Sequence, residues 1–458
     1  MLTSISPIDG RYAKSTKPLA PYFSEAASMK YKIILEGEYL IALSDNKIMR
    51  RLSTREKSII RNLYNFTETD AKIVSQIELK GYKGIKATNH DFKAIEYFIK
   101  DKLSKTSVKN ALEWIHFGLT SEDASNVAYA LMLSESLRDV YLPALTDLTS
   151  KIGHLAKANK NVAILARTHG QPASPTTFGK EMAVFAARLK KHSQILKNLR
   201  ISAKVNGATG NYNALVAAYP KVDWIKFSKK LIDQISKQRK VSLEINLLTT
   251  QINPHDSYAE LFDAFRRINT ILIGFNQDLW RYISDEWVQQ KPVAGEVGSS
   301  TMPHKINPWF LENSEGNLGM ANAMFEFFSR KLPISRLQRD LSDSTVLRNI
   351  GSAIGHTLIG FKYLNNQLGR IVINKDKAKK DLADHVEVLA EAIQSILRRE
   401  GVKMPYEQLK ELTRGKQITL SDLHRFIDSL DVSDKVKKEL KRFTPENYIG
   451  LASKLASF

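Results

Sequence analysis

The chain has 458 residues, of which 43% are hydrophobic and 25% charged, and this composition is typical of a globular protein. At about 150 residues per domain, its length predicts roughly three domains. It contains no cysteine, which excludes disulfides, thiolate metal sites and cysteine nucleophiles and fits the reducing cytoplasm.

The net charge is the unusual feature of the composition. Lysine and arginine number 68 against 48 acidic residues, which gives a formal charge of +20. Three interpretations are open: nucleic-acid binding, attraction of polyanionic small substrates, and a lysine-rich solvated surface. The basic residues are scattered, and no basic block is interleaved with aromatic residues. Specific nucleic-acid binding is therefore the least favoured of the three.

The N-terminal sequence gives no indication of export. Residues 1–7 lack the basic and apolar regions of a signal peptide. Nowhere do about 18 apolar residues follow one another, which is the length that a membrane-spanning helix needs. We therefore expect a cytoplasmic protein without a membrane partner.

One long segment without glycine or proline covers residues 85–117 and predicts helix. Thr88 or Asn89 is the expected N-cap of a helix that continues through Phe98. Helix N-termini also bind anions, so the segment at 87–91 is equally a candidate binding site. The segment at 119–123 has the same two interpretations.

Residues 167–172, Arg-Thr-His-Gly-Gln-Pro, predict a break between two helices. His169 lies there among side chains that could donate hydrogen bonds to a carboxylate or phosphate. A lone histidine is more often structural than catalytic, so this segment alone decides nothing.

Three later segments repeat apolar residues at the spacing of one helix face. The positions are Met182, Phe185, Leu189, Leu196 and Leu199 in the first; Leu261, Phe265, Ile268, Leu272, Phe275, Leu279 and Tyr282 in the second; and Leu382, Val386, Leu389, Ile393 and Ile396 in the third, which Gly401 ends. Such patterns predict an all-α fold built on a bundle of long helices, with other subunits as possible contributors. We expect an N-terminal helical domain at 1–110, a central long-helix domain at 111–365 and a C-terminal helical domain at 366–458.

The segment at 291–308, KPVAGEVGSSTMPHKINP, interrupts the helical pattern with three prolines and two glycines. Gly298 permits unusual backbone angles, which would let neighbouring N–H groups converge on an anion. Two serine hydroxyls, an imidazole and an ammonium follow within seven positions. The alternative is a plain surface connection rich in turn formers. Metal binding fits poorly, because the nearby histidines lack ligand spacing and HExxH is absent; phosphate-loop, dinucleotide and serine-hydrolase motifs are also missing.

These segments carry a family resemblance. The loop GSSTMPHKINP at 298–308 resembles the signature of the fumarase/aspartase superfamily, and its MPHK form resembles adenylosuccinate lyases and carboxymuconate cycloisomerases. Further segments favour the longer bacterial form of adenylosuccinate lyase: SPIDGRY at 6–12, TNHD at 88–91, HFGLTSED at 116–123, RTHGQPASPTTFGKEM at 167–182, TTQINPHD at 249–256, RDLSDSTVLRN at 339–349 and YEQLKELTRGK at 406–416.

The resemblance implies three helical domains, with the central helices of four subunits forming one bundle. Each active site would then be shared between subunits of a homotetramer. It implies elimination of fumarate from adenylosuccinate to give AMP, and from the succinylcarboxamide ribotide SAICAR to give AICAR, in purine nucleotide biosynthesis. Neither a metal nor an organic cofactor is expected.

The resemblance also assigns roles residue by residue. Ser299 corresponds to the general base and His169 to the general acid. Lys305 would help to stabilise charge, and Glu312 would orient the histidine. Residues that match the family's substrate-binding positions are Arg11, Tyr12, Asn89, His90, Asp91, Thr120, Ser121, Gln251, Ser300, Asn307, Arg339, Ser344, Thr345, Val346, Leu347 and Arg348.

Three alternatives remain open from the sequence. Another lyase of the superfamily or a carboxymuconate cycloisomerase would share the loop. A structural relative without activity would share the fold, although the presence of Ser299, Lys305, His169 and Glu312 together speaks against it. A basic nucleic-acid-binding protein is the third.

Overall fold

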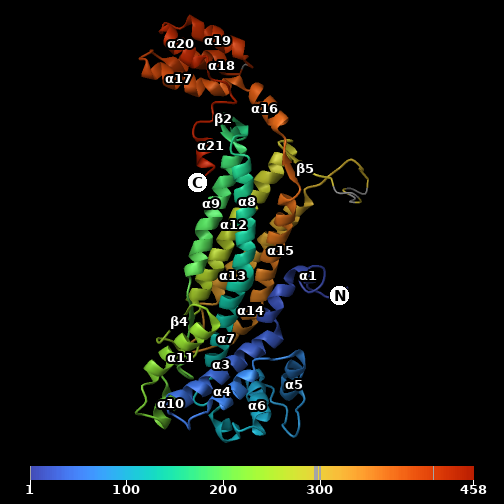
Figure 1. The fold of residues 1–458 in the computed structure, drawn as a ribbon, viewed down its shortest axis with the longest axis vertical. Helices are drawn as coiled ribbons and strands as arrows, with labels where there is room; N and C mark the ends of the chain where they lie inside the picture. Colours follow the sequence, from blue (N-terminus) through green and yellow to red (C-terminus); the bar gives the residue numbers. More distant parts are fainter. Residues whose placement is uncertain (1, 293–294, 296–297, 299–300, 416, 458) are drawn as a thin grey trace. The chain divides into compact units, whose positions relative to one another are not determined.

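The computed structural model describes every residue of the chain except 1, 293–294, 296–297, 299–300, 416 and 458. The chain divides into two compact units (Figure 1). Unit 1 comprises Met1–Leu145, His192–Thr270 and Asn317–Ile359, and unit 2 comprises Thr146–Lys191, Ile271–Gly316 and Gly360–Phe458. The three-domain division expected from the sequence stays a prediction.

Most elements of unit 1 are helices. They are α1 (Ala13–Thr16), η1 (Lys17–Leu19), α2 (Ala20–Phe23), α3 (Glu25–Asp45), α4 (Thr54–Asn62), α5 (Glu68–Leu79), α6 (Asp91–Ser104), η2 (Lys109–Trp114), α7 (Ser121–Ser136), the π-helical turn η3 (Leu137–Tyr141), α10 (Asn213–Ala218), α11 (Trp224–Arg239) and α14 (Ser342–Leu347), with the short strands β3 (Ile201–Ala203) and β4 (Leu243–Ile245).

Five long helices contribute residues to both units: α8 (Leu142–Ala158), α9 (Phe178–Asn198), α12 (Asp256–Ser284), α13 (Trp309–Lys331) and α15 (Ile350–Leu368). The remaining elements of unit 2 are β1 (Ala163–Thr168), β2 (Gln171–Thr177), β5 (Val288–Gln290), β6 (Ile371–Ile373), α16 (Lys375–Ala383), η4 (Val386–Leu389), α17 (Ala390–Arg399), α18 (Pro405–Thr413), α19 (Leu420–Ser429), α20 (Asp434–Leu440) and α21 (Ala452–Leu455).

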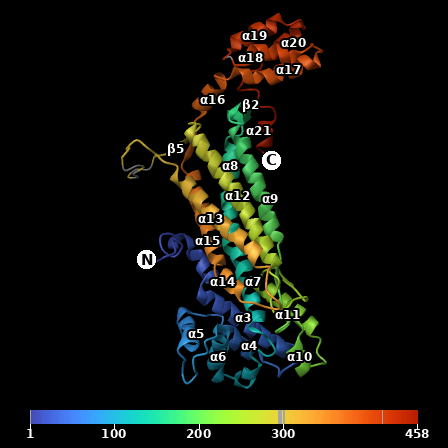
Figure 2. The ribbon, with the colours of Figure 1, turned by 180° about the vertical axis from the view of Figure 1, so that it is seen from behind.

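The all-α class is confirmed, since the strands in the described part of the chain form only three two-stranded sheets. The second apolar pattern is confirmed as a helix face. The first is confirmed from Met182 to Leu196, but its last member, Leu199, lies beyond the end of α9 at Asn198. Within unit 1, α12 and α13 lie side by side (Figures 1 and 2), and the rings of Phe262 and Phe325 stack at 5.7 Å. Within unit 2, Phe185 of α9 meets Phe275 of α12 edge to face at 5.2 Å. Buried aromatic contacts of this kind hold the long helices together.

The third apolar pattern was predicted as one helix, and this was wrong. The chain leaves the helix after α16 and continues through η4 into α17. His385 has φ −128° and ψ 61°, outside the helical range, and its Nδ1 lies 2.7 Å from Glu387 Oε1. Val386, Leu389 and Ile393 are nevertheless buried in one C-terminal core. The predicted end at Gly401 is confirmed, since this residue has φ +77°.

No described helix combines the length and the apolar character that crossing a membrane requires.

Candidate active site

A cavity of about 890 Å³ opens in unit 1. Its volume is in the range of small-molecule sites. Ten of the residues predicted to bind substrate line it: Asn89, His90, Asp91, Thr120, Ser121, Gln251, Arg339, Ser344, Leu347 and Arg348. They come from four separate stretches of sequence, which the fold of unit 1 brings together.

Four other predicted binding residues of unit 1 are not among the described residues that line this cavity. Arg11 is exposed, and Tyr12 is the N-cap of α1. On α14, Thr345 is exposed and Val346 is buried.

The start of α6 forms one wall of the cavity. His90 is the N-cap, and its Nδ1 accepts a hydrogen bond from Lys93 N at 3.3 Å. The predicted caps, Thr88 and Asn89, were wrong. Asn89 has φ +47°, so the chain turns there and reaches extended geometry one residue later. Asp91 forms an ion pair with the nearly buried ammonium of Lys32 at 2.8 Å.

The start of α7 forms a second wall and is held from below by Asp123. This buried carboxylate accepts hydrogen bonds from the backbone N–H groups of Thr120 at 2.9 Å and Asn206 at 3.0 Å. It also lies 3.0 Å from the ammonium of Lys204. Thr120 and Ser121 are thereby fixed at a helix N-terminus, where backbone N–H groups favour an anion.

A third wall carries Arg339, which the sequence predicted, and Glu122, which it did not. Arg339 Nη1 lies 2.5 Å from Glu122 Oε2. Burial raises the pKa of Glu122 to about 7, although Arg339 opposes this shift. Glu122 stands beside Ser121 in the TSED motif, and this neighbourhood was the only available signal for it in the sequence.

The cavity of one chain carries more acidic than basic groups. Its basic side chains are Lys32, Arg339 and Arg348, and its acidic ones are Glu78, Asp91, Glu122, Asp340 and Asp343. Three positive and five negative charges leave a formal charge of −2, with His90 counted as neutral. Bringing a polyanion here would require further cations.

The segment around His169 is a β-hairpin, where the sequence predicted a break between helices. Strands β1 and β2 are antiparallel, with Thr168 opposite Gln171. His169 and Gly170 form the two-residue turn, with φ +54° and +75°. Positive φ at both positions is the type I′ geometry that suits a hairpin. The imidazole is consequently displayed at an exposed tip, in a conformation that non-glycine residues adopt mainly where function or strain requires it.

The loop that interrupts the helices closes on itself in unit 2. Asn307 Nδ2 donates to Gly298 O at 2.8 Å. A Cβ on Gly298 would lie 1.9 Å from Lys305 O. Gly298 is therefore required because two backbone segments approach closely, and not because of a positive φ, which it does not have. The predicted convergence of neighbouring N–H groups on an anion stays a prediction. Lys305 is exposed. Ser299 and Ser300 lie outside the described residues.

Glu312 lies in the first turn of α13, and its Oε1 accepts a hydrogen bond from Trp280 Nε1 at 3.2 Å. Between the described side chains of His169 and Glu312 in one chain there is neither a hydrogen bond nor an ion pair. Their expected pairing stays a prediction.

Comparison with known proteins identifies the family. A model of a lyase family matches residues 10–323, and a model of the adenylosuccinate lyase C-terminal region matches residues 335–449. The chain belongs to the adenylosuccinate lyase family. It is 46% identical to an adenylosuccinate lyase of Legionella pneumophila (strain Corby), over 99% of this chain and 98% of that one. It is 48% identical to that of Dictyostelium discoideum, over 98% and 97% of the two chains.

Solved structures of more distant proteins support the fold of this adenylosuccinate lyase family member. A 3-carboxy-cis,cis-muconate lactonizing enzyme from Pseudomonas putida is similar with a TM-score of 0.72 and 20% identity, over 96% of this chain and 95% of that one. A fumarate lyase from Mesorhizobium sp. BNC1 gives a TM-score of 0.73 at 15% identity, over 96% of both chains. At these identities the likeness concerns the fold alone.

Proposed function

We propose that this chain is an adenylosuccinate lyase, which eliminates fumarate from adenylosuccinate to give AMP and from SAICAR to give AICAR. The observation that carries the proposal is the cavity of unit 1, where ten residues that match the family's binding positions meet. Nearly full-length identity to adenylosuccinate lyases supports the same conclusion. The products place the enzyme in purine nucleotide biosynthesis, and we propose the cytoplasm as its location.

The reaction breaks a C–N bond and removes a proton from the neighbouring carbon. That proton is weakly acidic, so the developing charge must be spread into the adjacent carboxylate and stabilised there by fixed donors. The N-terminus of α7, with Thr120 and Ser121, and the guanidinium of Arg339 provide such donors in the cavity. We propose that these donors bind the carboxylates or the phosphate of the substrate.

We assign the proton transfers to Ser299 and His169. A serine hydroxyl is a poor base alone, so Lys305 and loop N–H groups would have to favour its deprotonated form. His169 would protonate the leaving nitrogen, because an imidazole titrates near neutral pH. Its display at the tip of a β-hairpin supports this role, since the two-residue turn defines the backbone conformation that carries the ring. Glu312 would orient the imidazole.

We propose further that the sites are shared between subunits of a homotetramer. The formal charge of −2 in the cavity of one chain supports this, because a succinylated nucleotide is itself polyanionic and needs cations such as Lys305 and Arg11 from elsewhere. A helix face also lies open on α13, at Gly316, Gly319, Met320, Ala323 and Phe327. A Cβ on either glycine would meet nothing within 4 Å, which leaves room for a second helix. We also propose that the chain divides into three domains, with boundaries at about residues 110 and 365.

The test of the function is the turnover of adenylosuccinate and of SAICAR by the purified protein, followed by loss of their absorbance, beside argininosuccinate and fumarate as alternative substrates. We expect elimination from adenylosuccinate and SAICAR only. Turnover of another substrate with none of adenylosuccinate would contradict the proposal.

Subunit exchange tests the shared site. We expect His169→Ala and Arg339→Met proteins each to be nearly inactive, and a mixture of the two to regain activity after exchange. A mixture with the summed activity of its parts would argue against composite sites.

A further inference from the structure

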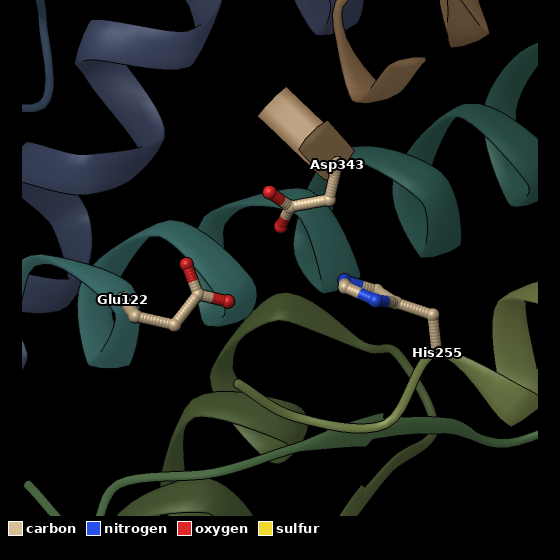
Figure 3. Close-up of side chains that lie close together, drawn as sticks. All are labelled: Glu122, His255 and Asp343. Atoms are coloured by element: carbon tan, nitrogen blue, oxygen red, sulfur yellow. The ribbon is translucent and has the colours of Figure 1, made fainter. Parts of the chain in front are cut away.

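The basic side chains that line the cavity are each paired with a carboxylate, and the pair of Arg339 with Glu122 is anchored below the cavity. Glu122 lies beside the buried side chains of His255 and Asp343 (Figure 3). One nitrogen or oxygen atom of each of these three residues lies within 4.8 Å of the other two. The position of Arg339, which the sequence motifs predicted to bind substrate, is therefore accounted for.

Lys32 is a further cation of the cavity, and it belongs to none of the sequence motifs that carry the family resemblance. It lies on α3, and its side chain is 9% exposed, against 21% for Arg339 and 54% for Arg348. Taking an ammonium group this far out of water is costly unless a partner compensates for the lost hydration. The burial of Lys32 therefore depends on the residue with which it pairs.

That partner is Asp91, one of the predicted binding residues. Lys32 Nζ donates a hydrogen bond to Asp91 Oδ2 at 2.8 Å, and Oδ1 accepts the backbone N–H of Phe92 at 2.7 Å. A carboxylate oxygen has more than one lone pair, so each oxygen can accept a further donor. The side chain of Asp91 is 41% exposed and lines the cavity. Its remaining lone pairs can therefore accept hydrogen bonds from a bound substrate.

Packing alone cannot orient the carboxylate of Asp91. Lys32 and Asp91 also line a second cavity, of about 440 Å³, so open space adjoins the pair on more than one side. The backbone beside Asp91 is held by α5, because Asn89 N donates to Glu78 O at 2.9 Å. The side chain depends on its hydrogen bonds, and the bond from Lys32 is the one that ties it to another helix.

Lys32 compensates the charges of two carboxylates. Burial would raise the pKa of Asp91, but the charge and hydrogen bond of Lys32 outweigh burial and lower that pKa below its ordinary value. Burial raises the pKa of Glu78, which lines both cavities, and Lys32 opposes this shift too. Asp91 is therefore ionised at neutral pH and can only accept hydrogen bonds. Without Lys32, both carboxylates would repel an anionic substrate.

Resting on the proposed function, we propose that Lys32 is a positioning residue of this site. Its ammonium orients the carboxylate of Asp91 and cancels its charge, so that Asp91 accepts a hydrogen bond from the substrate without repelling it. Adenylosuccinate offers two kinds of donor to such an acceptor, the N–H between the purine and the succinyl group and the hydroxyls of the ribose. Lys32 has no part in the proton transfers assigned to Ser299 and His169, so it affects substrate binding and not the rate of elimination.

A double-mutant cycle tests whether Lys32 acts through Asp91. Lys32→Met removes the ammonium and keeps a long side chain, and Asp91→Asn removes the charge that the ammonium holds. Lys32→Arg keeps the positive charge, and the second cavity leaves room for the larger group. Lys93→Met is the matched control on α6. The ammonium of Lys93 lies 2.7 Å from Glu96, and Lys93 is not among the described residues that line either cavity.

We expect Lys32→Met to raise the KM for adenylosuccinate at least tenfold at pH 7, with kcat changed by less than about threefold. Lys32→Arg should stay within about threefold of the wild-type KM, because it restores the charge. Asp91→Asn should also raise KM at least tenfold. The double variant Lys32→Met/Asp91→Asn should have a KM within about threefold of Asp91→Asn alone, because Lys32 has then lost the group through which it acts. Lys93→Met should behave as wild type.

Several results would overturn the inference. They are an unchanged KM in a folded Lys32→Met protein, a fall in kcat alone, a Lys32→Arg protein as impaired as Lys32→Met, or a double variant in which the two increases in KM multiply. If Lys32→Met does not fold, the double variant, which leaves neither charge unpaired, decides by its comparison with Asp91→Asn. Absence of adenylosuccinate turnover in the wild type would instead refute the proposed function.

Discussion

The ammonium of Lys204 lies 3.0 Å from the carboxylate of Asp123, and both side chains are fully buried. Asp123 also receives the N–H groups of Asn206 and Gly207. Removing only the positive partner leaves a buried carboxylate without its counter-charge, which typically costs about 3–5 kcal/mol. We expect Lys204→Met to lower the free energy of unfolding by this amount, as measured by urea denaturation.

The control for this pair is an exposed one. Lys72 and Glu68 form an ion pair with side chains 74% and 82% exposed, and Lys72→Met should leave the free energy of unfolding nearly unchanged because solvent screens such a pair. A loss below about 1 kcal/mol in Lys204→Met would show that the buried pair does not hold the start of α7.

His116 gives the protein a pH-dependent contribution to stability. Its Nδ1 lies 2.8 Å from Glu36 Oε1. Burial favours the neutral ring, but the hydrogen bond and the charge of Glu36 outweigh it and raise the pKa of His116 above its ordinary value of 6.5. A raised pKa contributes stability that is complete below pH 6.5 and lost as the pH rises through the folded-state pKa.

The stability difference between wild type and His116→Asn should therefore be larger at pH 6 than at pH 9. Thermal or urea unfolding at the two pH values measures it. An equal difference at both, or a larger one at pH 9, would contradict the ion pair.

Much of the fold was predictable because long amphipathic helices have apolar residues at regular spacings in the sequence. The positions of the predicted pattern in α12, from Leu261 to Leu279, are all buried, as the pattern required. The apolar spacing at 382–396 predicted one helix wrongly. A helix and a 3-10 turn can bury apolar residues at similar spacings, so the periodicity does not indicate the break in the helical backbone at His385. The hairpin at His169 was missed because it lies between the long helices α8 and α9, whose periodic patterns predicted only a break between helices.

The site was predictable where the sequence motifs carry side chains into the cavity. Arg339 and His90 belong to such motifs. Asp343 stands in the same motif as Arg339, and Glu122 and His255 stand in two other motifs of the family resemblance, but none of the three was singled out. These three side chains come together only because three segments that are distant in the sequence meet at one buried place, and no residue spacing in the sequence predicts that meeting.

Gly298 should be intolerant of any side chain. A Cβ would lie 1.9 Å from Lys305 O, so Gly298→Ala must displace the loop that carries Ser299 and Lys305. We expect at least a tenfold loss of adenylosuccinate turnover with little change in melting temperature, because the loop's described residues are mostly exposed.

Gly295→Ala is the matched variant. Gly295 has φ +80°, and a Cβ there would meet nothing within 4 Å. It suffers backbone strain of about 1–2 kcal/mol without a clash. Equal losses of turnover in the two variants would show that strain, and not the contact with Lys305, determines the effect.

His169→Asn separates the imidazole from the turn that carries it. Asparagine tolerates the positive φ of position 169, so the hairpin should persist. Loss of the acid should lower kcat by about 10²–10⁴-fold. His154→Asn, which removes an exposed histidine elsewhere in unit 2, should leave kcat unchanged. If His169→Asn retained near-native kcat, another group would have to protonate the leaving nitrogen.

The most direct test is adenylosuccinate turnover with and without the hydroxyl of Ser299, with Ser300→Ala as the neighbouring control. If Ser299 is the base, Ser299→Ala should lower kcat by at least about 10³-fold while the protein still binds adenylosuccinate, and Ser300→Ala should mainly raise KM. Near-native turnover by Ser299→Ala would contradict the mechanism.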